Sequence, residues 1–573
     1  MTDKQRFLTD LIERMSLDQK VGACITLGFN GTILTPNILD YVTRYHCGGL
    51  RVTPPERTFG NYVDPKTGKA SLEIKGDNYF YKKGGHPPEL TGAEYLEIAN
   101  ELNAAARSRP LSLPLHFSFD NEGEGNVSFK GFSMFPQPMG LAATGEKRFA
   151  YEVAKAIGRQ ARSVGMTMIH SPVLDVNTDP RNPEINIRAY SDRAETVAEF
   201  AVETCRGFKE VGIAATGKHF PGRGDSADDA HYDVPVIGVD FDTLWNRELL
   251  PYRHLIGQNL LPALMLAHTV YPAVDPDSIG TLSRKMITGL IREKLGFQGV
   301  VTTDSMTMAG VTRHFGVAEA CARSLAAGSD QVLMKAQNDL VGETFSAIKA
   351  FVEDGRISME ELDQKLFRNL GLKYDLGLFE ETVERESPDA LVADPALKNL
   401  EREVAQRSCI VLRSQPGALP LPRDRKLLLV EQICTERNNC HQHPALMFKH
   451  AIRYNPRLAF CEISFSADEE DLARMNALIP DYDTIVLTNF QDRASAAHTG
   501  FLVEQIAKHP DKTFIVVVNK PFAFTVPENA KNVICTFSKA PQSLKAGVDL
   551  LFGELKPTGK LPIATPTKAP KEK

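Results

Sequence analysis

The sequence predicts an α/β fold in which a (β/α)8 TIM barrel is followed by a smaller C-terminal α/β sandwich domain. Short apolar runs alternate with segments of helical periodicity through residue 335, as in a barrel of parallel strands and outer helices. Several of these runs end at an ionisable residue, and a separate series of strand and helix patterns follows residue 400. A chain of 573 residues has room for both domains.

Eight strands are predicted for the barrel, each a short and mostly apolar run. In chain order they are Cys24–Phe29, Gly49–Thr53, Leu115–Asp120, Met166–Val173, Ile213–Gly217, Ala263–His268, Gly299–Asp304 and Gln331–Lys335. The segments between them mostly show helical periodicity. We therefore expect functional residues on the loops at the carboxyl ends of the strands.

Charged and polar side chains mark the ends of four predicted strands. Asp120, His268 and Asp304 are the last residues of their runs, and Lys218 directly follows another run. Ionisable groups at buried strand ends are costly unless they are paired or used. Their recurrence predicts one shared site.

The connection after the second strand, from Pro54 to Leu90, is long for a compact barrel. It is rich in Lys, Gly, Tyr and Phe and includes the segment Tyr79–Lys83. One interpretation is a solvated hairpin with no catalytic role. The other is a loop over the mouth of the site, whose aromatic side chains stack against a sugar or a leaving group.

The composition becomes acidic and loop-like around Glu380–Pro395, which predicts an inter-domain linker. The chain then divides into a barrel domain at 1–376, a linker at 377–400 and an α/β sandwich domain at 401–573. The strands predicted for the second domain are Ser408–Leu412, Lys426–Val430, Thr484–Thr488, Thr513–Val518 and Asn532–Phe537.

Charge and hydropathy exclude several functional classes. The formal net charge is −6 and no long basic run occurs, which argues against a nucleic-acid partner. The N-terminus lacks the apolar core of a signal peptide, and no apolar run reaches the roughly 18 residues that a membrane span needs. We expect a cytoplasmic protein with no membrane partner, either a monomer or a homodimer.

The nine cysteines lack the regular spacing of a disulfide scaffold, which predicts free thiols. Cys434, Cys440, His441 and His443 lie within ten residues of one another, but their spacing fits no standard zinc site. We interpret this segment as a polar surface loop, and expect no metal and no bound cofactor.

The most informative segment is Lys218–His231, which reads Lys-His-Phe-Pro-Gly-Arg-Gly-Asp-Ser-Ala-Asp-Asp-Ala-His. It places the carboxylate of Asp229 two residues before an imidazole in a Gly-rich loop, a pattern typical of a paired acid/base. The segment resembles the β-N-acetylglucosaminidase branch of glycoside hydrolase family 3, in which a Lys-His-Phe-Pro-Gly-(His)-Gly motif precedes an Asp-x-His dyad. The resemblance covers nearly the whole chain and implies a small carbohydrate substrate.

The resemblance implies three catalytic residues. Asp304, in the segment Thr-Asp-Ser-Met, matches the Ser-Asp-x-Met context of the family's nucleophile; capping of the next helix is the alternative. His231 is implied as the acid/base and Asp229 as the carboxylate that fixes its tautomer. An exposed, idle histidine is the alternative, and Asp225 and Asp228 are rival partners. Retaining cleavage needs both an attacking carboxylate and a proton donor.

Four residues match the family's positions for gripping the glycone: Asp120, Arg188, Lys218 and His219. Asp120 opens Asp-Asn-Glu-Gly, which is similar to the family's Asp-Gln-Glu-Gly, and Arg188 lies in Asn-Pro-Glu-Ile-Asn-Ile-Arg-Ala-Tyr, which resembles its Asn-Pro-x-Ile-x-x-Arg-Ser-Phe. Several charged groups that converge on one place can bind the hydroxyl groups of a sugar. They are needed because each buried hydroxyl without a hydrogen-bond partner costs about 1–3 kcal/mol. For Lys218 and Arg188, the alternative is a salt bridge at the barrel rim. His268 also matches, and a satisfied core histidine explains it equally well.

Three departures from the family pattern lie near the expected sugar site. The segment after Asp120 lacks an expected Arg, Arg223 stands where the relatives have His, and Arg51 is charged where they are usually apolar. A plain β-glucoside and a 2-acetamido sugar therefore both stay open as substrates.

The same departures affect which molecule, phosphate or water, is expected to accept the glycosyl group. A neutral imidazole does not repel an incoming phosphate dianion, and a nearby Arg attracts it. Arg223 and Arg51 are therefore candidate phosphate contacts, with unliganded rim arginines as the alternative. We expect retaining cleavage of β-D-glucosides or β-N-acetyl-D-glucosaminides through a covalent glycosyl–Asp304 intermediate. The glycosyl group then passes to inorganic phosphate as a co-substrate, with the anomeric configuration retained; hydrolysis is the alternative.

Two other functional classes are less consistent with the residues. A catalytically silent carbohydrate-binding protein would have lost Asp304, Asp229 or His231, and all three are present. A nucleotide-phosphate loop needs a Gly-x-Gly-x-x-Gly or Gly-x4-Gly-Lys-(Ser/Thr) pattern, which the Gly-Arg-Gly of this loop does not satisfy.

Overall fold

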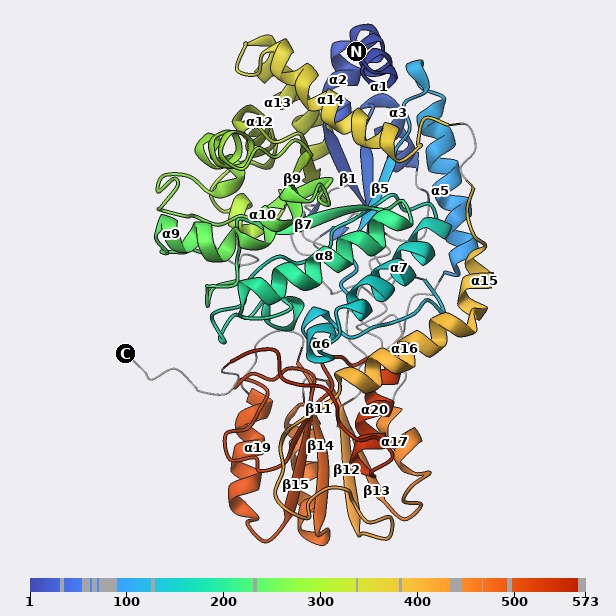
Figure 1. The fold of residues 1–573 in the computed structure, drawn as a ribbon, viewed down its shortest axis with the longest axis vertical. Helices are drawn as coiled ribbons and strands as arrows, with labels where there is room; N and C mark the ends of the chain where they lie inside the picture. Colours follow the sequence, from blue (N-terminus) through green and yellow to red (C-terminus); the bar gives the residue numbers. More distant parts are fainter. Residues whose placement is uncertain are drawn as a thin grey trace.

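The structure is a computed structural model. It describes residues 1–30, 34, 36–53, 62–63, 70–71, 90–124, 129–229, 234–335, 338–380, 384–432, 446–465, 467–491 and 497–564. These residues form a closed barrel and a second sheet with its own helices, which lies below the barrel in Figure 1.

Eight parallel strands close the barrel in the order β1-β10-β9-β8-β7-β6-β5-β2, which confirms the predicted fold class. The barrel strands are β1 (Ile25–Asn30), β2 (Gly49–Thr53), β5 (His116–Phe119), β6 (Met168–Ile169), β7 (Ala214–Phe220), β8 (Ala263–Leu266), β9 (Val300–Ser305) and β10 (Gln331–Met334). Each corresponds to one of the eight predicted runs.

The strand β6 differs most from its prediction, because the predicted run Met166–Val173 pairs as a strand over two residues. Pro172 has no amide hydrogen and cannot donate to a strand ladder. Beyond it the pairing continues as an isolated bridge between Val173 and Lys218. The regular ladder of β6 is therefore shorter than the predicted run, although backbone bonds to β7 continue as far as Leu174.

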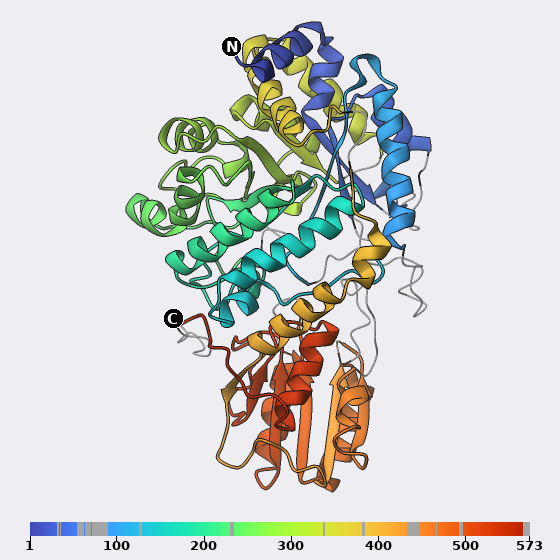
Figure 2. The same ribbon diagram turned by 45° about the vertical axis from the view of Figure 1, so that its right-hand side comes forward.

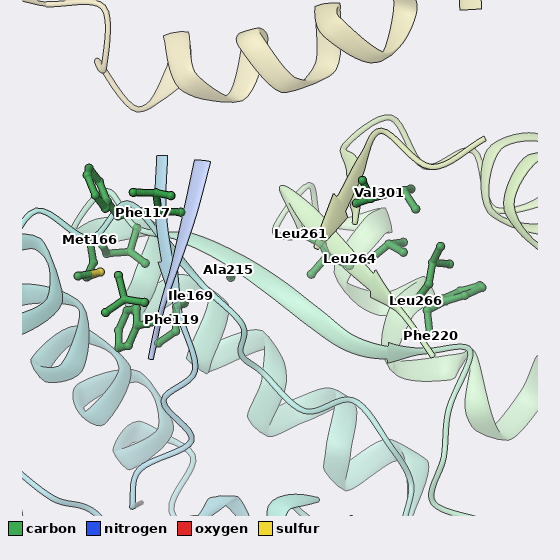
Figure 3. Packing of buried hydrophobic residues seen from close by; sticks show 14 of the residues in the cluster. Phe117, Phe119, Met166, Ile169, Ala215, Phe220, Leu261, Leu264, Leu266 and Val301 are labelled. Carbon is green, nitrogen blue, oxygen red and sulfur yellow. The ribbon is translucent and has the colours of Figure 1, made fainter. Parts of the chain in front are cut away.

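The barrel strands are buried on both faces. All seven residues of β7 are buried, as expected for a parallel strand covered by helices. Apolar side chains of several barrel strands, including Phe117, Leu264 and Val301, belong to one hydrophobic cluster (Figure 3). This packing fixes the positions from which the polar strand ends project.

Helices surround the barrel, and capping boxes mark several of their starts, such as Thr2 with Gln5 and Ser358 with Glu361. The helices are α1 (Asp3–Arg14), α2 (Leu17–Ala23), α3 (Pro36–Arg44), α5 (Gly92–Arg107), α6 (Pro138–Ala143), α7 (Arg148–Ser163), α8 (Ala194–Glu210), α9 (Phe241–Thr243), α10 (Leu250–Gly257), α11 (Ala309–Thr312), α12 (Val317–Ala327), α13 (Leu340–Glu353) and α14 (Met359–Asp375). The 3₁₀ and π segments are η1 (Pro110–Ser112), η2 (Asn186–Arg188), η3 (Leu244–Glu248), η4 (Gly280–Leu282) and η5 (Lys285–Lys294).

The second sheet has six strands in the order β11-β16-β15-β14-β12-β13, with β11 antiparallel to β16 and the other pairs parallel. Its elements are β11 (Ile410–Arg413), β12 (Leu427–Gln432), α17 (Leu446–Ala451), β13 (Ala459–Ile463), α18 (Glu469–Leu478), η6 (Ile479–Asp481), β14 (Thr484–Asn489), α19 (Ala497–Lys508), β15 (Thr513–Val518), β16 (Val533–Cys535) and α20 (Pro541–Leu551). Five strands were predicted. The missed strand, β13, lies at the sheet edge and is only partly buried, so its sequence carries a weaker apolar signal.

The predicted linker at 377–400 contains helix α15 (Pro388–Ala393) and the start of helix α16 (Pro395–Ser408). In Figure 1, α16 runs along the side of the molecule from the barrel to the second sheet. This segment therefore forms helices, although its composition is acidic and typical of a loop. The domain limits at 376 and 400 stay a prediction.

The carboxyl end of the barrel faces the second sheet (Figure 2). Glu124, which follows β5, accepts hydrogen bonds from the Lys539 backbone N–H at 2.9 Å from each carboxylate oxygen. The Lys560 backbone N–H donates to the Ala143 carbonyl at 2.7 Å. These contacts place the second domain against the loops that carry the candidate site.

In the long connection after β2, the described residues form a short antiparallel hairpin of β3 (Tyr62–Val63) and β4 (Ala70–Ser71). The aromatic segment Tyr79–Lys83 lies outside the described residues, as does the Cys434–His443 cluster. In the described part of the chain, no helix combines the length and the apolar character that a membrane crossing requires.

Candidate active site

The predicted site residues that the structure describes gather at the carboxyl ends of the barrel strands. Asp120 follows β5, Lys218 and His219 lie in β7, His268 follows β8 and Asp304 lies in β9. The shared site predicted from the polar strand ends is thus formed by neighbouring elements of the barrel.

Asp120 and Glu122 anchor a network of alternating charges. The Lys218 ammonium nitrogen lies 3.0 Å from Asp120 Oδ1 and 2.6 Å from Glu122 Oε1. Arg188 binds Glu122 through two parallel bonds, at 2.7 Å from Nε and 3.0 Å from Nη2. Arg51 donates to the other oxygen of Asp120. The network is a set of fixed donors and acceptors of the kind that sugar hydroxyls require.

Electrostatics keep this network ionised. Burial alone raises the pKa of Glu122, but Arg188 and Lys218 outweigh burial and bring it to about 2. Burial lowers the pKa of the Lys218 ammonium, and Glu122 opposes this effect. Glu122 was not among the predicted site residues, although it stands in the Asp-Asn-Glu-Gly segment that the sequence had singled out.

Asp304 is a partly buried carboxylate whose side chain is 13% exposed. Its Oδ1 accepts the Ser305 backbone N–H at 2.7 Å, and its Oδ2 lies 3.5 Å from Arg223 Nη2. Burial raises the pKa of Asp304, but nearby positive charge, led by Arg223, holds it well below its usual range. The carboxylate is therefore charged and able to act as a nucleophile.

The alternative role for Asp304, capping of the next helix, is inconsistent with the structure. Helix α11 begins at Ala309 and its N-cap residue is Met308, four residues beyond Asp304. Asp304 instead bonds the backbone of its own neighbour at the end of β9.

The loop that carries the predicted dyad is held at several points. The Tyr271 hydroxyl donates to the Gly222 carbonyl at 2.8 Å, and Arg247 Nη2 lies 2.5 Å from Asp225 Oδ2. Asp225, a rival dyad partner, is thus paired with an arginine, and the other rival, Asp228, is exposed. Asp229 is half-buried at the end of the described loop, and His231 lies outside the described residues.

His219 is oriented by a carboxylate that sequence reasoning missed. Its Nδ1 lies 2.8 Å from Asp175 Oδ2, and the other oxygen of Asp175 accepts the Arg223 backbone N–H at 2.7 Å. Asp175 is fully buried, and burial raises its pKa to about 6. Its position at the end of the apolar segment Pro172–Leu174 is the signal that could have identified it.

His268 is fully buried with both ring nitrogens against chain atoms. Nδ1 lies 2.7 Å from the Thr281 hydroxyl and Nε2 lies 3.0 Å from the Ser305 carbonyl oxygen. Burial lowers the pKa of the ring and so favours its neutral form, and the Ser305 carbonyl, which can only accept, places the ring proton on Nε2. This arrangement favours the satisfied core histidine over a direct sugar ligand.

The two arginines predicted as phosphate contacts have different surroundings. Arg51 donates to Asp120 and so belongs to the charge network. Arg223 is 3% exposed, and its Nη2 lies 2.8 Å from Glu184 Oε1. Its Nε and Nη1 are buried without a hydrogen-bond partner among the described residues. These two nitrogens are the part of the Arg223 guanidinium group that no described residue pairs.

Gly224 sets how closely the dyad loop approaches the barrel. A Cβ atom at this position would lie 1.8 Å from the Val176 carbonyl oxygen, which is a backbone atom and cannot turn away. We expect Gly224→Ala to displace the loop, lower the free energy of unfolding by about 1–3 kcal/mol and reduce turnover. Gly238→Ala is the matched control, because a Cβ there meets nothing within 4 Å. Urea unfolding measures the change in stability, and kcat measures the change in turnover. If the two variants had the same stability and the same kcat, the close approach at Gly224 would be refuted.

The closed barrel, the appended α/β domain and the buried carboxylates at the carboxyl ends of the strands define a two-domain TIM-barrel protein with a site of the kind that glycosidases use. Residues 91–372 match the family model described as the glycosyl hydrolase family 3 N terminal domain. A β-hexosaminidase of Xylella fastidiosa is 34% identical over 264 residues, which cover 45% of this chain and 76% of that protein. The chain belongs to glycosyl hydrolase family 3, which confirms the resemblance found in its motifs.

Two further relatives extend the comparison. A β-N-acetylglucosaminidase/β-glucosidase of Cellulomonas fimi is 32% identical over 347 residues, which cover 59% of this chain and 60% of that protein. The chain thus spans about three fifths of that relative's length. A solved family 3 β-N-acetylglucosaminidase from Paenibacillus sp. strain FPU-7 has a TM-score of 0.84 at 28% identity, and the match covers 97% of this chain and all of that one.

Proposed function

We propose that the protein cleaves β-D-glucosides or β-N-acetyl-D-glucosaminides with retention of configuration, through a covalent glycosyl–Asp304 intermediate. The observation that carries the proposal is the partly buried, ionised Asp304 at the end of β9, in the same site as the charge network of Asp120, Glu122, Lys218 and Arg188. A charged carboxylate beside fixed sugar-type ligands is what a retaining glycosidase needs.

The proposed reaction has two steps. Asp304 attacks the anomeric carbon while the bond to the leaving oxygen breaks, and His231 as imidazolium gives that oxygen a proton. The neutral His231 then removes a proton from the acceptor, which attacks the same carbon and releases the Asp304 carboxylate. Each step inverts the anomeric centre, so the product keeps the β configuration.

The names of the relatives support a 2-acetamido sugar as one substrate. The Xylella fastidiosa relative is called a β-hexosaminidase, and the Cellulomonas fimi relative carries both activities in its name. The departures at Arg223 and after Asp120 keep a plain β-glucoside as the other substrate.

Water is the acceptor that the names of the relatives support, and phosphate is the second candidate. The observation that favours phosphate is that no described residue pairs with two donor nitrogens, Nε and Nη1, of the buried Arg223 guanidinium. A guanidinium with free donors binds phosphate oxygens through charge-assisted bonds.

Turnover of aryl β-glucoside and aryl β-N-acetylglucosaminide, with and without phosphate, tests the proposal. We expect release of the aryl group from at least one of them and, if phosphate is the acceptor, a β-configured sugar-1-phosphate in the ³¹P NMR spectrum. Free sugar at a phosphate-independent rate would assign hydrolysis. No turnover of either substrate would refute the proposed function.

A further inference from the structure

A second acidic residue contacts the arginine beside the nucleophile. Glu184 Oε1 lies 2.8 Å from Arg223 Nη2, whereas the carboxylate of Asp304 lies 3.5 Å from the same nitrogen. The Glu184 side chain is 8% exposed and that of Arg223 is 3% exposed. Two carboxylates therefore share one buried guanidinium group, and the nearer one is Glu184.

The backbone fixes this arrangement through one amide side chain. Asn182 Oδ1 accepts the backbone N–H groups of Glu184 at 3.0 Å and Ile185 at 2.7 Å. Its Nδ2 donates to the Arg223 carbonyl at 2.7 Å. Asn182 is 1% exposed, so the loop after β7 and the turn that carries Glu184 are tied together in the interior. The two side chains meet because their backbones are held in place.

Glu184 also connects the nucleophile to the sugar-binding network. Arg188 Nη1 lies 3.8 Å from Glu184 Oε1 and donates to the Glu184 carbonyl at 3.2 Å. Positive and negative groups thus alternate from Glu122 through Arg188, Glu184 and Arg223 to Asp304. A change at Glu184 is therefore transmitted to Asp304 through Arg223.

The competition for Arg223 has a chemical consequence. A charge-assisted N–H···O⁻ bond is strongest at about 2.7–2.9 Å. Arg223 makes its close contact with Glu184 and stays farther from Asp304. Without the Glu184 charge, the guanidinium group would pair closely with Asp304 and occupy the lone pairs that attack the anomeric carbon.

We infer that Glu184 is a positioning residue that restrains Arg223 and so keeps Asp304 available as the nucleophile. The inference rests on the proposed function. It also accounts for a departure from the family pattern, because an arginine in place of the family's histidine brings a permanent positive charge next to the nucleophile, and Glu184 balances it.

A double-mutant cycle tests this inference. Glu184→Gln keeps the size of the side chain and removes its charge, and we expect it to lower kcat/KM for an activated aryl glycoside about 10–100-fold. The parameter kcat/KM reports the first irreversible step, in which Asp304 attacks. We expect the double variant with Arg223→Gln to be faster than Glu184→Gln alone, because the group that would trap Asp304 is then gone.

Rescue of kcat/KM at an unchanged thermal midpoint separates positioning from a merely structural role, because removing Arg223 also relieves an uncompensated buried charge and would restore stability as well. The matched control is Asp179→Asn, an acidic residue on the same segment whose carboxylate pairs with Arg181, and it should stay within about twofold of the wild type. A double variant no faster than Glu184→Gln, or a Glu184→Gln variant as fast as the wild type, would overturn the inference. Inactivity of the wild type on both aryl glycosides would instead refute the proposed function.

Discussion

Asp304→Ala is expected to lower kcat for aryl β-glycosides at least about 10⁴-fold, a loss typical of removing a nucleophile. The substitution removes the group that bonds to the anomeric carbon. Two other carboxylates of the site are already paired, Glu122 with Arg188 and Lys218 and Glu184 with Arg223, so we do not expect them to replace it. Steady-state rates of the purified variant, with its thermal midpoint as a check of folding, measure the effect. A rate near that of the wild type would exclude Asp304 as the nucleophile.

Azide provides a stereochemical test of the same assignment. In Asp304→Ala, azide can enter the space left by the carboxylate and attack the anomeric carbon of a 2,4-dinitrophenyl β-glycoside from that side. One inversion gives an α-glycosyl azide. If Asp304 were the acid/base instead, the covalent intermediate would still form, and azide would open it to a β-glycosyl azide. The anomeric coupling constant of the product distinguishes the two outcomes.

The barrel was predictable because its strands are buried on both faces. A parallel strand covered by helices reads as an unbroken apolar run, and β7 and β9 show this pattern clearly. The length of β6 was not predictable from the apolar run alone, because Pro172 removes a backbone donor. The edge strand β13 has one paired side and partial exposure, so its sequence lacks the same signal.

The positions of the site residues were predictable where a polar residue interrupts an apolar run, as at Asp120 and Asp304. Their partners were not, because they depend on segments that meet only in the folded chain. Glu184 lies 39 positions before Arg223, and Asp175 lies 44 positions before His219. No local pattern reports such pairings.

Arg51 is a second residue whose partner could not be identified from the sequence. Its charge in an otherwise apolar strand indicated an anion partner, and phosphate was the candidate. The folded chain supplies an anion of its own, since Arg51 donates to Asp120. A buried guanidinium group needs a counter-charge, and the sequence cannot tell whether the protein or a ligand provides it.

His231→Ala is expected to slow glycosides with poor leaving groups about 10²–10⁴-fold and to affect 2,4-dinitrophenyl glycosides much less. His231 lies outside the described residues, and the expectation rests on the Asp-x-His pattern and on the family resemblance. A poor leaving group needs a proton as its bond breaks, whereas dinitrophenolate departs without one. Rates across a series of aryl leaving groups measure the effect, and uniform losses across the series would contradict the acid role.

Variants of the two neighbouring aspartates separate the dyad partner from its rival. If Asp229 fixes the tautomer of His231, Asp229→Asn should reproduce the leaving-group dependence of His231→Ala, because an amide does not stabilise the imidazolium as a carboxylate does. Asp228→Asn changes an equivalent charge on an exposed neighbour and should leave the series close to that of the wild type. The same dependence in both variants would mean that the loop acts through its total charge. Dependence in Asp229→Asn alone would support the pairing of that carboxylate with the acid, because the exposed charge of Asp228 is screened by solvent.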